Sequence, residues 1–262
     1  MEKKAFFFDI DETLLSWITH EVPASAIYAL EELKKKGHLT FINSGRMFST
    51  VPDMVKKLPV TGFICGCGTQ IISENETLLL KRVPQERRTE ITNLIWECDG
   101  DVIWEGEDDC FFSEKTSRFD RLEGTRRHFG EFGFGKSTYL ESENYIASKF
   151  CFYADEKTDL DKIMKNLSVD MEVMDRGDFY EVSPASNSKA SGIDFVLEHF
   201  CIGKEHAYVF GDSSNDLSMF KAVKHAIAME KHDPILDPYA EFVTKTVEED
   251  GILYALKHYG IL

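Results

Sequence analysis

Short apolar runs alternate with helical patterns at both ends of the chain. Residues 6–8 are three phenylalanines that end at Asp9, and a short continuous apolar run of this kind is typical of a buried parallel strand. Residues 23–36 have helical periodicity, with Pro23 suited to the first turn and Gly37 ending the pattern. The other predicted elements are, in chain order, strand 39–42, helix 46–58, strand 63–65, helix 188–200, strand 207–210, helix 217–223, strands 225–229 and 241–244, and helix 248–258. This β-α order predicts a mainly parallel sheet covered on both faces.

The middle of the chain has a different pattern. Strand-like runs, at 102–104 and 150–153 among others, accompany two amphipathic helices whose apolar residues recur at i, i+3, i+4 and i+7. These apolar positions are Ile91, Leu94, Ile95 and Cys98 in the first helix, and Leu160, Ile163, Met164 and Leu167 in the second. We therefore predict an α/β core with a parallel sheet, formed by residues 1–82 and 184–262. Residues 83–183 are predicted to form an inserted α+β domain.

Composition and charge restrict the class of partner. The 262 residues carry a net charge of −16, and such a surface repels nucleic-acid backbones. No apolar run approaches the roughly 20 residues that span a bilayer. The apolar stretch near the N-terminus is also too short for a signal peptide, whose apolar region has about 7–15 residues. We therefore expect a cytoplasmic protein that binds neither nucleic acid nor membrane.

The six cysteines match no zinc-binding spacing. Cys65 and Cys67 are close enough in sequence to form a redox or metal pair. Because no second pair of ligands accompanies them, we interpret them as small residues at a tight strand end.

Two carboxylates follow the first predicted strand. If the extended geometry continues, Asp9 and Asp11 project to the same side, beyond the carboxyl end of the strand, where α/β sheets bind ligands. Two close carboxylates repel each other unless a cation or a shared proton compensates. Taken alone, this spacing also fits a turn or a surface pair.

Two further strand ends carry polar groups. Ser44 and Gly45 precede a predicted helix, and a hydroxyl beside free N–H groups at a helix start forms a cradle for phosphate. An ordinary serine N-cap gives the same pattern. Asp212 follows strand 207–210 and offers a hard oxygen ligand that suits Mg²⁺ rather than zinc, with Asp216 expected to support the metal from behind it; an Asx-type turn is the alternative.

A lysine stands at the start of the predicted helix 188–200. The cation of Lys189 is unfavourable at this end of the helix dipole. Its position becomes intelligible if phosphate and carboxylates lie nearby to pair with it.

Taken together, these motifs resemble the haloacid dehalogenase superfamily. The series is Asp9-x-Asp11-x-Thr13, Ser44-Gly45-Arg46, Lys189 and Gly211-Asp212-x-x-Asn215-Asp216. Their order and the long insertion after the second motif look like its Cof-type branch with a type IIB cap, and residues 248–252 are similar to its C-terminal signature. Two positions depart from the family pattern: Glu12 replaces a common glycine, and residues 65–68 replace a common Asn-Gly turn.

The resemblance implies a Mg²⁺-dependent phosphatase for small phosphate monoesters, such as sugar phosphates or phosphorylated cofactors. Asp9 is the implied nucleophile, forming an aspartyl phosphate, and Asp11 the implied general acid and base. The implied metal ligands are Asp9, Asp212 and the backbone carbonyl of Asp11, supported by Asp216 and Thr13. The implied phosphate-binding groups are Ile10, Ser44, Gly45, Lys189 and Asn215. The inserted domain is expected to close over the site and to read the rest of the substrate through Arg118 and Arg176.

Three alternative functions compete with this interpretation. A phosphomutase uses the same groups but returns phosphate to the sugar. A dehalogenase leaves Asp11 and the metal carboxylates without a role. A non-catalytic module that binds a phosphorylated metabolite is expected to lack the nucleophile or a metal carboxylate, and this chain has both.

Overall fold

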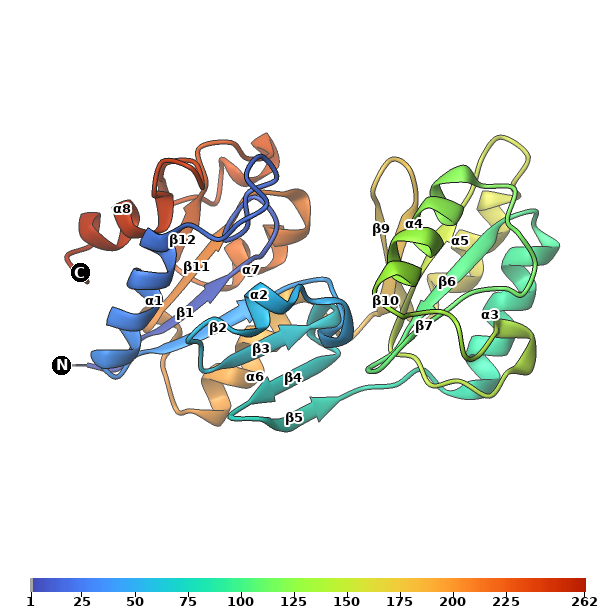
Figure 1. The fold of residues 1–262 in the computed structure, drawn as a ribbon, viewed down its shortest axis with the longest axis horizontal. Coiled ribbons are helices and arrows are strands. Elements are labelled where there is room, and N and C mark those ends of the chain that lie inside the picture. Colours follow the sequence, from blue (N-terminus) through green and yellow to red (C-terminus); the bar gives the residue numbers. More distant parts are fainter. Residues whose placement is uncertain (1) are drawn as a thin grey trace. The chain divides into compact units, whose positions relative to one another are not determined.

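The computed structural model describes residues 2–262, which divide into two compact units. The core unit contains the residues up to Arg46, Thr50–Leu79 and Asn187–Leu262. The inserted unit contains Leu80–Ser186 together with Met47–Ser49. The unit boundaries therefore fall three residues outside the 83–183 division expected from the sequence. Each unit has its own sheet and helices (Figure 1).

Within residues 2–262, the core unit holds an eight-stranded sheet in the order β13-β12-β11-β1-β2-β3-β4-β5. Its strands are β1 (Ala5–Phe8), β2 (Leu39–Asn43), β3 (Gly62–Cys65), β4 (Gln70–Ser73), β5 (Glu76–Leu80), β11 (Ala207–Gly211), β12 (His225–Ala228) and β13 (Phe242–Val243). All pairs from β13 to β3 are parallel, whereas β4 is antiparallel to β3. The predicted α/β core with a parallel sheet is confirmed. The hairpin of β4 and β5 was not predicted.

Helices cover both faces of this sheet. They are α1 (Ala24–Lys35), α2 (Asp53–Lys56), α6 (Lys189–His199), α7 (Leu217–Ala222) and α8 (Gly251–His258), with short 3₁₀ turns at Phe48–Thr50, Gly66–Gly68, Lys204–His206, Ser214–Asp216 and Pro234–Leu236. Phe7 belongs to the cluster that α6 and α7 cover. The alternate side chain Phe6 stacks on Tyr208, whose ring meets Tyr259 at the end of α8. Alternation along β1 thus supplies both layers of the core.

The predicted helix 46–58 is wrong. The chain instead forms a 3₁₀ turn at Phe48–Thr50 and a single α-helical turn, α2, that begins directly after Pro52. Proline has no N–H to donate within a helix, and it disfavours helical backbone in the residue before it. Pro52 therefore interrupts the apolar pattern that suggested one continuous helix.

The inserted unit has an antiparallel sheet in the order β7-β6-β8-β10-β9. Its elements are α3 (Gln85–Glu97), β6 (Asp101–Glu105), β7 (Cys110–Phe111), α4 (Asp120–Glu131), a 3₁₀ turn at Leu140–Ser142, β8 (Lys149–Tyr153), α5 (Leu160–Leu167), β9 (Met171–Asp175) and β10 (Tyr180–Pro184). The two predicted helices, α3 and α5, pack on one sheet face around Trp104 and Phe150. Helix α4 was not predicted, because Leu122 is its only buried residue.

A cluster of charges is buried in the inserted unit. The ammonium of Lys149 contacts the carboxylate of Glu181 and lies 3.5 Å from Glu105 Oε1. Arg176 Nη2 lies 2.6 Å from Glu181 Oε2. Burial alone raises the pKa of Glu181, but Lys149 and Arg176 outweigh it and lower that pKa to about 2. Glu181 therefore stays ionised inside the unit.

None of the helices in residues 2–262 combines the length and the apolar character that crossing a membrane requires.

We predict that Lys149→Met lowers the free energy of unfolding by about 3–5 kcal/mol, because Glu181 loses a buried cation partner. Urea denaturation followed by circular dichroism measures the change. A matched control is Lys162→Met, since Lys162 is exposed and lies 3.5 Å from the exposed Glu97. That control is expected to leave stability nearly unchanged. Equal effects of the two substitutions would contradict a stabilising role for the buried cluster.

Candidate active site

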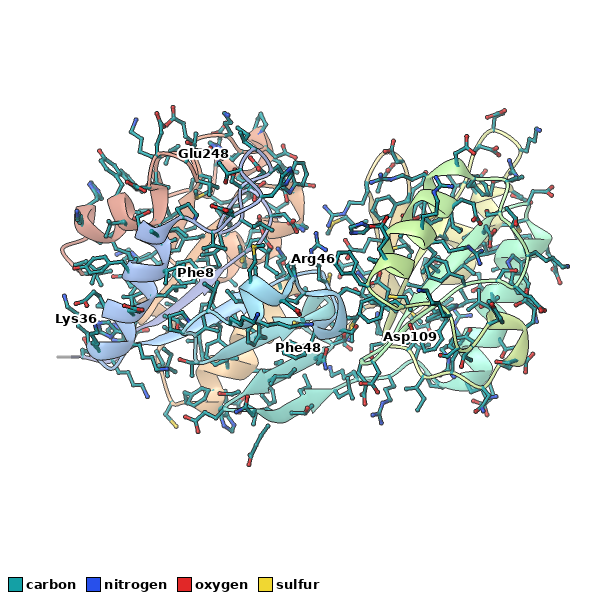
Figure 2. All side chains as sticks on the ribbon, viewed as in Figure 1. Phe8, Lys36, Arg46, Phe48, Asp109 and Glu248 are labelled. Carbon is teal, nitrogen blue, oxygen red and sulfur yellow. The ribbon has the colours of Figure 1, made fainter. Side chains whose placement is uncertain are left out.

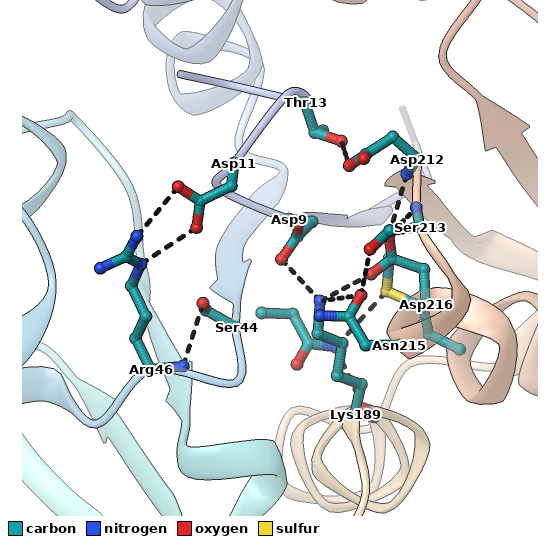
Figure 3. A network of polar contacts seen from close by, with 12 residues as sticks. Asp9, Asp11, Thr13, Ser44, Arg46, Lys189, Asp212, Ser213, Asn215 and Asp216 are labelled. Carbon is teal, nitrogen blue, oxygen red and sulfur yellow. Dashed lines mark hydrogen bonds and ion pairs between the residues drawn. The ribbon is translucent and has the colours of Figure 1, made fainter. Parts of the chain in front are cut away.

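The polar motifs meet at one edge of the core sheet. Phe8, the last residue of β1, pairs with Ile42 of β2 and with Phe210 of β11, so the three strands end at about the same level. Asp9 follows β1, and Asp212 follows β11. Figure 3 shows the side chains after these strands gathered with Lys189, the first residue of α6. Parallel pairing therefore brings together residues about 200 positions apart in the sequence.

A buried lysine lies at the centre of this site. Lys189 is 2% exposed, and its Nζ atom lies 2.5 Å from Asp9 Oδ1 and 2.6 Å from Asp216 Oδ1. Asn215 Oδ1 is 3.4 Å from the same ammonium. Burial lowers the pKa of Lys189, but Asp216 and Asp9 outweigh burial and raise it above its ordinary value. The lysine is therefore a permanent cation that holds one oxygen of Asp9.

Asp216 joins this lysine to the turn that carries Asp212. Its Oδ2 atom accepts hydrogen bonds from the backbone N–H groups of Asp212 at 2.9 Å and of Ser213 at 3.0 Å. A Cβ atom at Gly211 would come within 2.6 Å of the Asp216 carboxylate, so only glycine allows this close approach. Asp216 is fully buried, and both of its oxygens have partners. It therefore fixes the turn from which Asp212 projects.

Three carboxylates crowd together here. Asp9, Asp212 and Asp216 each offer an oxygen, and these oxygens lie within 4.8 Å of one another. Burial, the charge of Asp216 and that of Asp11 raise the pKa of Asp9 to about 7, against the opposing effect of Lys189. Burial together with Asp9 and Asp216 raises the pKa of Asp212 to about 8. A divalent cation relieves such repulsion, and an all-carboxylate set suits Mg²⁺.

Both oxygens of Asp216 already accept hydrogen bonds, and this indicates which of the three carboxylates remain to bind such an ion. Asp212 Oδ1 accepts a hydrogen bond from the Thr13 hydroxyl at 3.0 Å, which orients that carboxylate. Asp9 and Asp212 are thus the side chains best placed to bind a metal. Asp216 and Thr13 are placed to support them. The motif resemblance implies the same division of roles, which stays a prediction.

Asp11 has partners different from those of Asp9. Arg46 donates two hydrogen bonds of 3.0 Å to the Asp11 carboxylate, from Nε to Oδ2 and from Nη2 to Oδ1. The indole N–H of Trp17 donates to Oδ1 at 3.3 Å. Burial raises the pKa of Asp11, but the hydrogen bonds and charge of Arg46 outweigh it, and the pKa lies below its ordinary value. In Figure 3 Asp11 points toward Arg46, whereas Asp9 points toward Lys189.

The extended geometry assumed for residues 9–11 does not occur. Strand β1 ends at Phe8, and the chain turns at once, with the N–H groups of Leu14 and Leu15 donating to the carbonyl of Ile10 at 2.9 and 2.8 Å. Glu12 has a φ of 57° in this turn, a left-handed conformation that glycine, the residue implied there by the motif resemblance, adopts without strain. Asp9 and Asp11 therefore serve one site from two directions.

The Ser44-Gly45 motif is not the start of a regular helix. The N–H of Ser44 donates to the carbonyl of Ile64 at 2.9 Å, and its hydroxyl accepts from the N–H of Arg46 at 3.2 Å. The helix start expected after Gly45 is therefore wrong, whereas phosphate binding by Ser44 and Gly45 stays a prediction. Ser44 nevertheless lies at the carboxyl end of β2, beside the other site residues (Figure 3).

Sequence reasoning missed two anchors of this site. Asn43, the last residue of β2, donates from Nδ2 to the backbone carbonyl of Lys189 at 3.0 Å and so ties α6 to the sheet. Arg46 belonged to a recognised motif, but the motif gave no sign of its pairing with Asp11. An asparagine buried at a strand end, directly before Ser44, was the available signal for the first anchor.

The two arginines predicted to read the substrate lie in the inserted unit, and each has a carboxylate partner there. Arg118 Nη2 donates to Asp155 Oδ1 at 2.8 Å, and its guanidinium lies 4.2 Å from the ring centre of Phe119. Arg176 is bound to Glu181 in the buried charge cluster. Their contact with substrate stays a prediction.

Comparison with known proteins places this site in a family. The family model of haloacid dehalogenase-like hydrolases matches residues 6–256 of this chain. The chain is 31% identical to the putative phosphatase YkrA of Bacillus subtilis over the full length of both proteins. It is 27% identical to the 5-amino-6-(5-phospho-D-ribitylamino)uracil phosphatase YwtE of the same organism, over 96% of each chain.

Solved structures agree with this result. A phosphatase of the same superfamily from Bacteroides thetaiotaomicron has a TM-score of 0.86 and 26% identity, over 99% of this chain and 96% of that one. A sugar phosphatase of subclass IIB has a TM-score of 0.84 and 26% identity, over 99% of this chain and all of the other. The resemblance seen in the motifs is therefore confirmed. With nearly the whole chain matched and four motifs meeting at one sheet edge, this protein belongs to the haloacid dehalogenase-like hydrolases.

Proposed function

We propose that this protein is a Mg²⁺-dependent phosphatase that hydrolyses small phosphate monoesters through an aspartyl phosphate on Asp9. The arrangement of Asp9 carries the proposal: a buried carboxylate at the end of the central strand, held on one side by Lys189 and flanked by Asp212. The relatives support the substrate class, since they are named as phosphatases, one of them for a phosphorylated ribitylaminouracil and one for sugar phosphates.

The first step forms the phosphoenzyme. Lys189 holds Oδ1 of Asp9, which leaves the second oxygen to attack phosphorus as the ester P–O bond breaks. Asp11 gives a proton to the departing alkoxide oxygen. Asp9, Asp212 and the backbone carbonyl of Asp11 would hold Mg²⁺, which would supply positive charge to offset the repulsion between a carboxylate and an anionic ester. Lys189 contributes to the same neutralisation from the protein side.

The second step returns the free enzyme. Asp11, now ionised, takes a proton from a water molecule, and the resulting hydroxide attacks phosphorus and displaces the Asp9 carboxylate. Arg46 favours the ionised form of Asp11 that this step requires. For proton donation in the first step, the ion pair between Arg46 and Asp11 must open. Opening of the ion pair between Arg46 and Asp11 therefore determines when Asp11 can donate its proton.

Replacing the nucleophile tests the proposal most directly. Asp9→Asn is nearly isosteric but cannot attack phosphorus, so turnover is expected to fall more than about a thousandfold, or roughly 4 kcal/mol in barrier. Phosphate release measures the rate, and circular dichroism shows whether the fold persists. Asp194→Asn is the matched control, because Asp194 lies on the surface, paired with Lys204. A folded Asp9→Asn protein that retains more than about a tenth of the wild-type rate contradicts the mechanism.

Metal removal tests the carboxylate set. EDTA is expected to abolish phosphate release and excess Mg²⁺ to restore it, whereas Ca²⁺ substitutes poorly because it is larger and prefers looser coordination. Asp212→Asn is expected to raise the Mg²⁺ concentration that gives half-maximal activity. Mg²⁺ is also expected to raise the melting temperature of the wild type more than that of Asp212→Asn. Full activity in metal-free buffer would exclude the metal-dependent reaction.

Leaving-group dependence tests Asp11. In Asp11→Asn the backbone carbonyl remains, but no proton reaches the leaving oxygen, so sugar phosphates are expected to be almost inert. Nitrophenolate leaves without a proton, so 4-nitrophenyl phosphate is expected to give a burst of nitrophenol and then stall at the aspartyl phosphate. That intermediate is measured as hydroxylamine-sensitive phosphoprotein. Equal losses on both substrates, with no burst, would instead show that Asp11 mainly organises the metal site.

A further inference from the structure

The loop after β1 presents two large apolar side chains to solvent. Trp17 is 63% exposed and Ile18 is 67% exposed. Single exposed apolar residues are common and need no explanation. Trp17 differs from its neighbour because the side chain is anchored beside the proposed general acid.

Two hydrogen bonds hold Trp17. Its backbone N–H donates to Glu12 Oε1 at 2.6 Å, and its indole Nε1–H donates to Asp11 Oδ1 at 3.3 Å. An exposed tryptophan on a loop normally moves among several rotamers, whereas this ring is tied to a carboxylate of the active site. The ring is thus held ready for contact instead of being ordered at the moment of binding, which lowers the entropy cost of a contact.

The base of the loop is also fixed. Ser16 is 1% exposed, and its hydroxyl accepts hydrogen bonds from the N–H groups of Ile18 and Thr19, each at 3.0 Å. The same hydroxyl donates to Glu248, in the turn before α8. Glu248 is labelled beside this loop in Figure 2. The hydrogen bond to Glu248 therefore connects the loop that carries both Asp11 and Trp17 to the C-terminal segment.

The role proposed for Asp11 brings the leaving group of the ester near Trp17. A carboxyl group that protonates the leaving oxygen must come within about 2.6–3.2 Å of it. The indole nitrogen lies 3.3 Å from the same carboxylate. The leaving oxygen and the indole nitrogen are therefore neighbours of the same carboxylate, and a leaving group that extends toward the loop meets the indole ring.

We propose that Trp17 is a specificity-determining residue whose indole ring packs against the leaving group of the ester. The inference rests on the proposed function, since it requires Asp11 to meet the leaving oxygen. An exposed indole face gains most when a second apolar ring face covers it, because water is then removed from both surfaces. Phosphate esters with a ring in the leaving group are accordingly preferred over esters with a short open chain.

The test compares benzyl phosphate with ethyl phosphate. Both esters leave as primary alkoxides and need the same proton from Asp11, but only one carries a ring. In Trp17→Ala, kcat/KM for benzyl phosphate is expected to fall about 10- to 100-fold, mainly through KM, and for ethyl phosphate less than about 3-fold. Trp17→Phe keeps a ring face but loses the indole N–H, and it is expected to retain most of the preference for benzyl phosphate. Ile18→Ala alters an equally exposed neighbour and is expected to leave kcat/KM for both esters unchanged.

Each remaining outcome overturns the inference. Equal losses on both esters in Trp17→Ala mean that the residue acts through Asp11 or the fold. A Trp17→Phe protein that behaves like Trp17→Ala assigns the effect to the indole N–H. A wild-type protein without preference for the benzyl ester gives the ring no role.

Failure of the proposed function has a different result. Wild-type protein would then release no phosphate from either ester, or Asp9→Asn would not affect the release. Asp9-dependent hydrolysis of both esters, with a ratio that Trp17→Ala leaves unchanged, overturns only the inference about Trp17.

Discussion

The buried ammonium of Lys189 is the interaction on which the site depends. Burying a charge in the interior costs free energy unless opposite charges and hydrogen bonds surround it. Removing one member of a buried ion pair leaves the other member buried without compensation. Asp9 and Asp216 surround Lys189 at 2.5 and 2.6 Å. These three residues come from the end of β1, the start of α6 and the turn before α7. Correct burial of the lysine therefore requires all three segments to be in place.

The same constraint organises the rest of the site. Asp216 uses its second oxygen to hold the N–H groups of Asp212 and Ser213, so the cation that fixes Asp216 also fixes the turn carrying Asp212. Asn43 binds the carbonyl of Lys189 and connects that lysine to β2. The proposed nucleophile and metal ligands are thus held by groups that are already paired. Such preorganisation is what electrostatic catalysis of phosphoryl transfer requires.

Errors in the secondary-structure prediction arose where local pattern and backbone chemistry disagreed. The apolar residues of 46–58 have helical spacing, but Pro52 removes a donor and restricts its neighbour, so only α2 forms after it. Helix α4 escaped prediction for the opposite reason, since only Leu122 is buried and a stripe of apolar residues is missing. The strands and helices of the core were predictable because each buries a continuous apolar run or face, as in β1 and α1.

The sequence by itself determined which chemical groups the site contains and which end of the sheet they occupy. Asp9 and Asp212 each follow an apolar strand, and parallel strands end at one edge, so their meeting could be deduced. The tertiary structure alone decided the partners: Lys189 binds Asp9 and Asp216, Arg46 binds Asp11, and Trp17 lies against the same carboxylate. These pairings depend on where turns direct side chains after the strands end. A turn such as that at residues 10–15 is set by hydrogen bonds and packing with distant segments, which no periodicity in the sequence records.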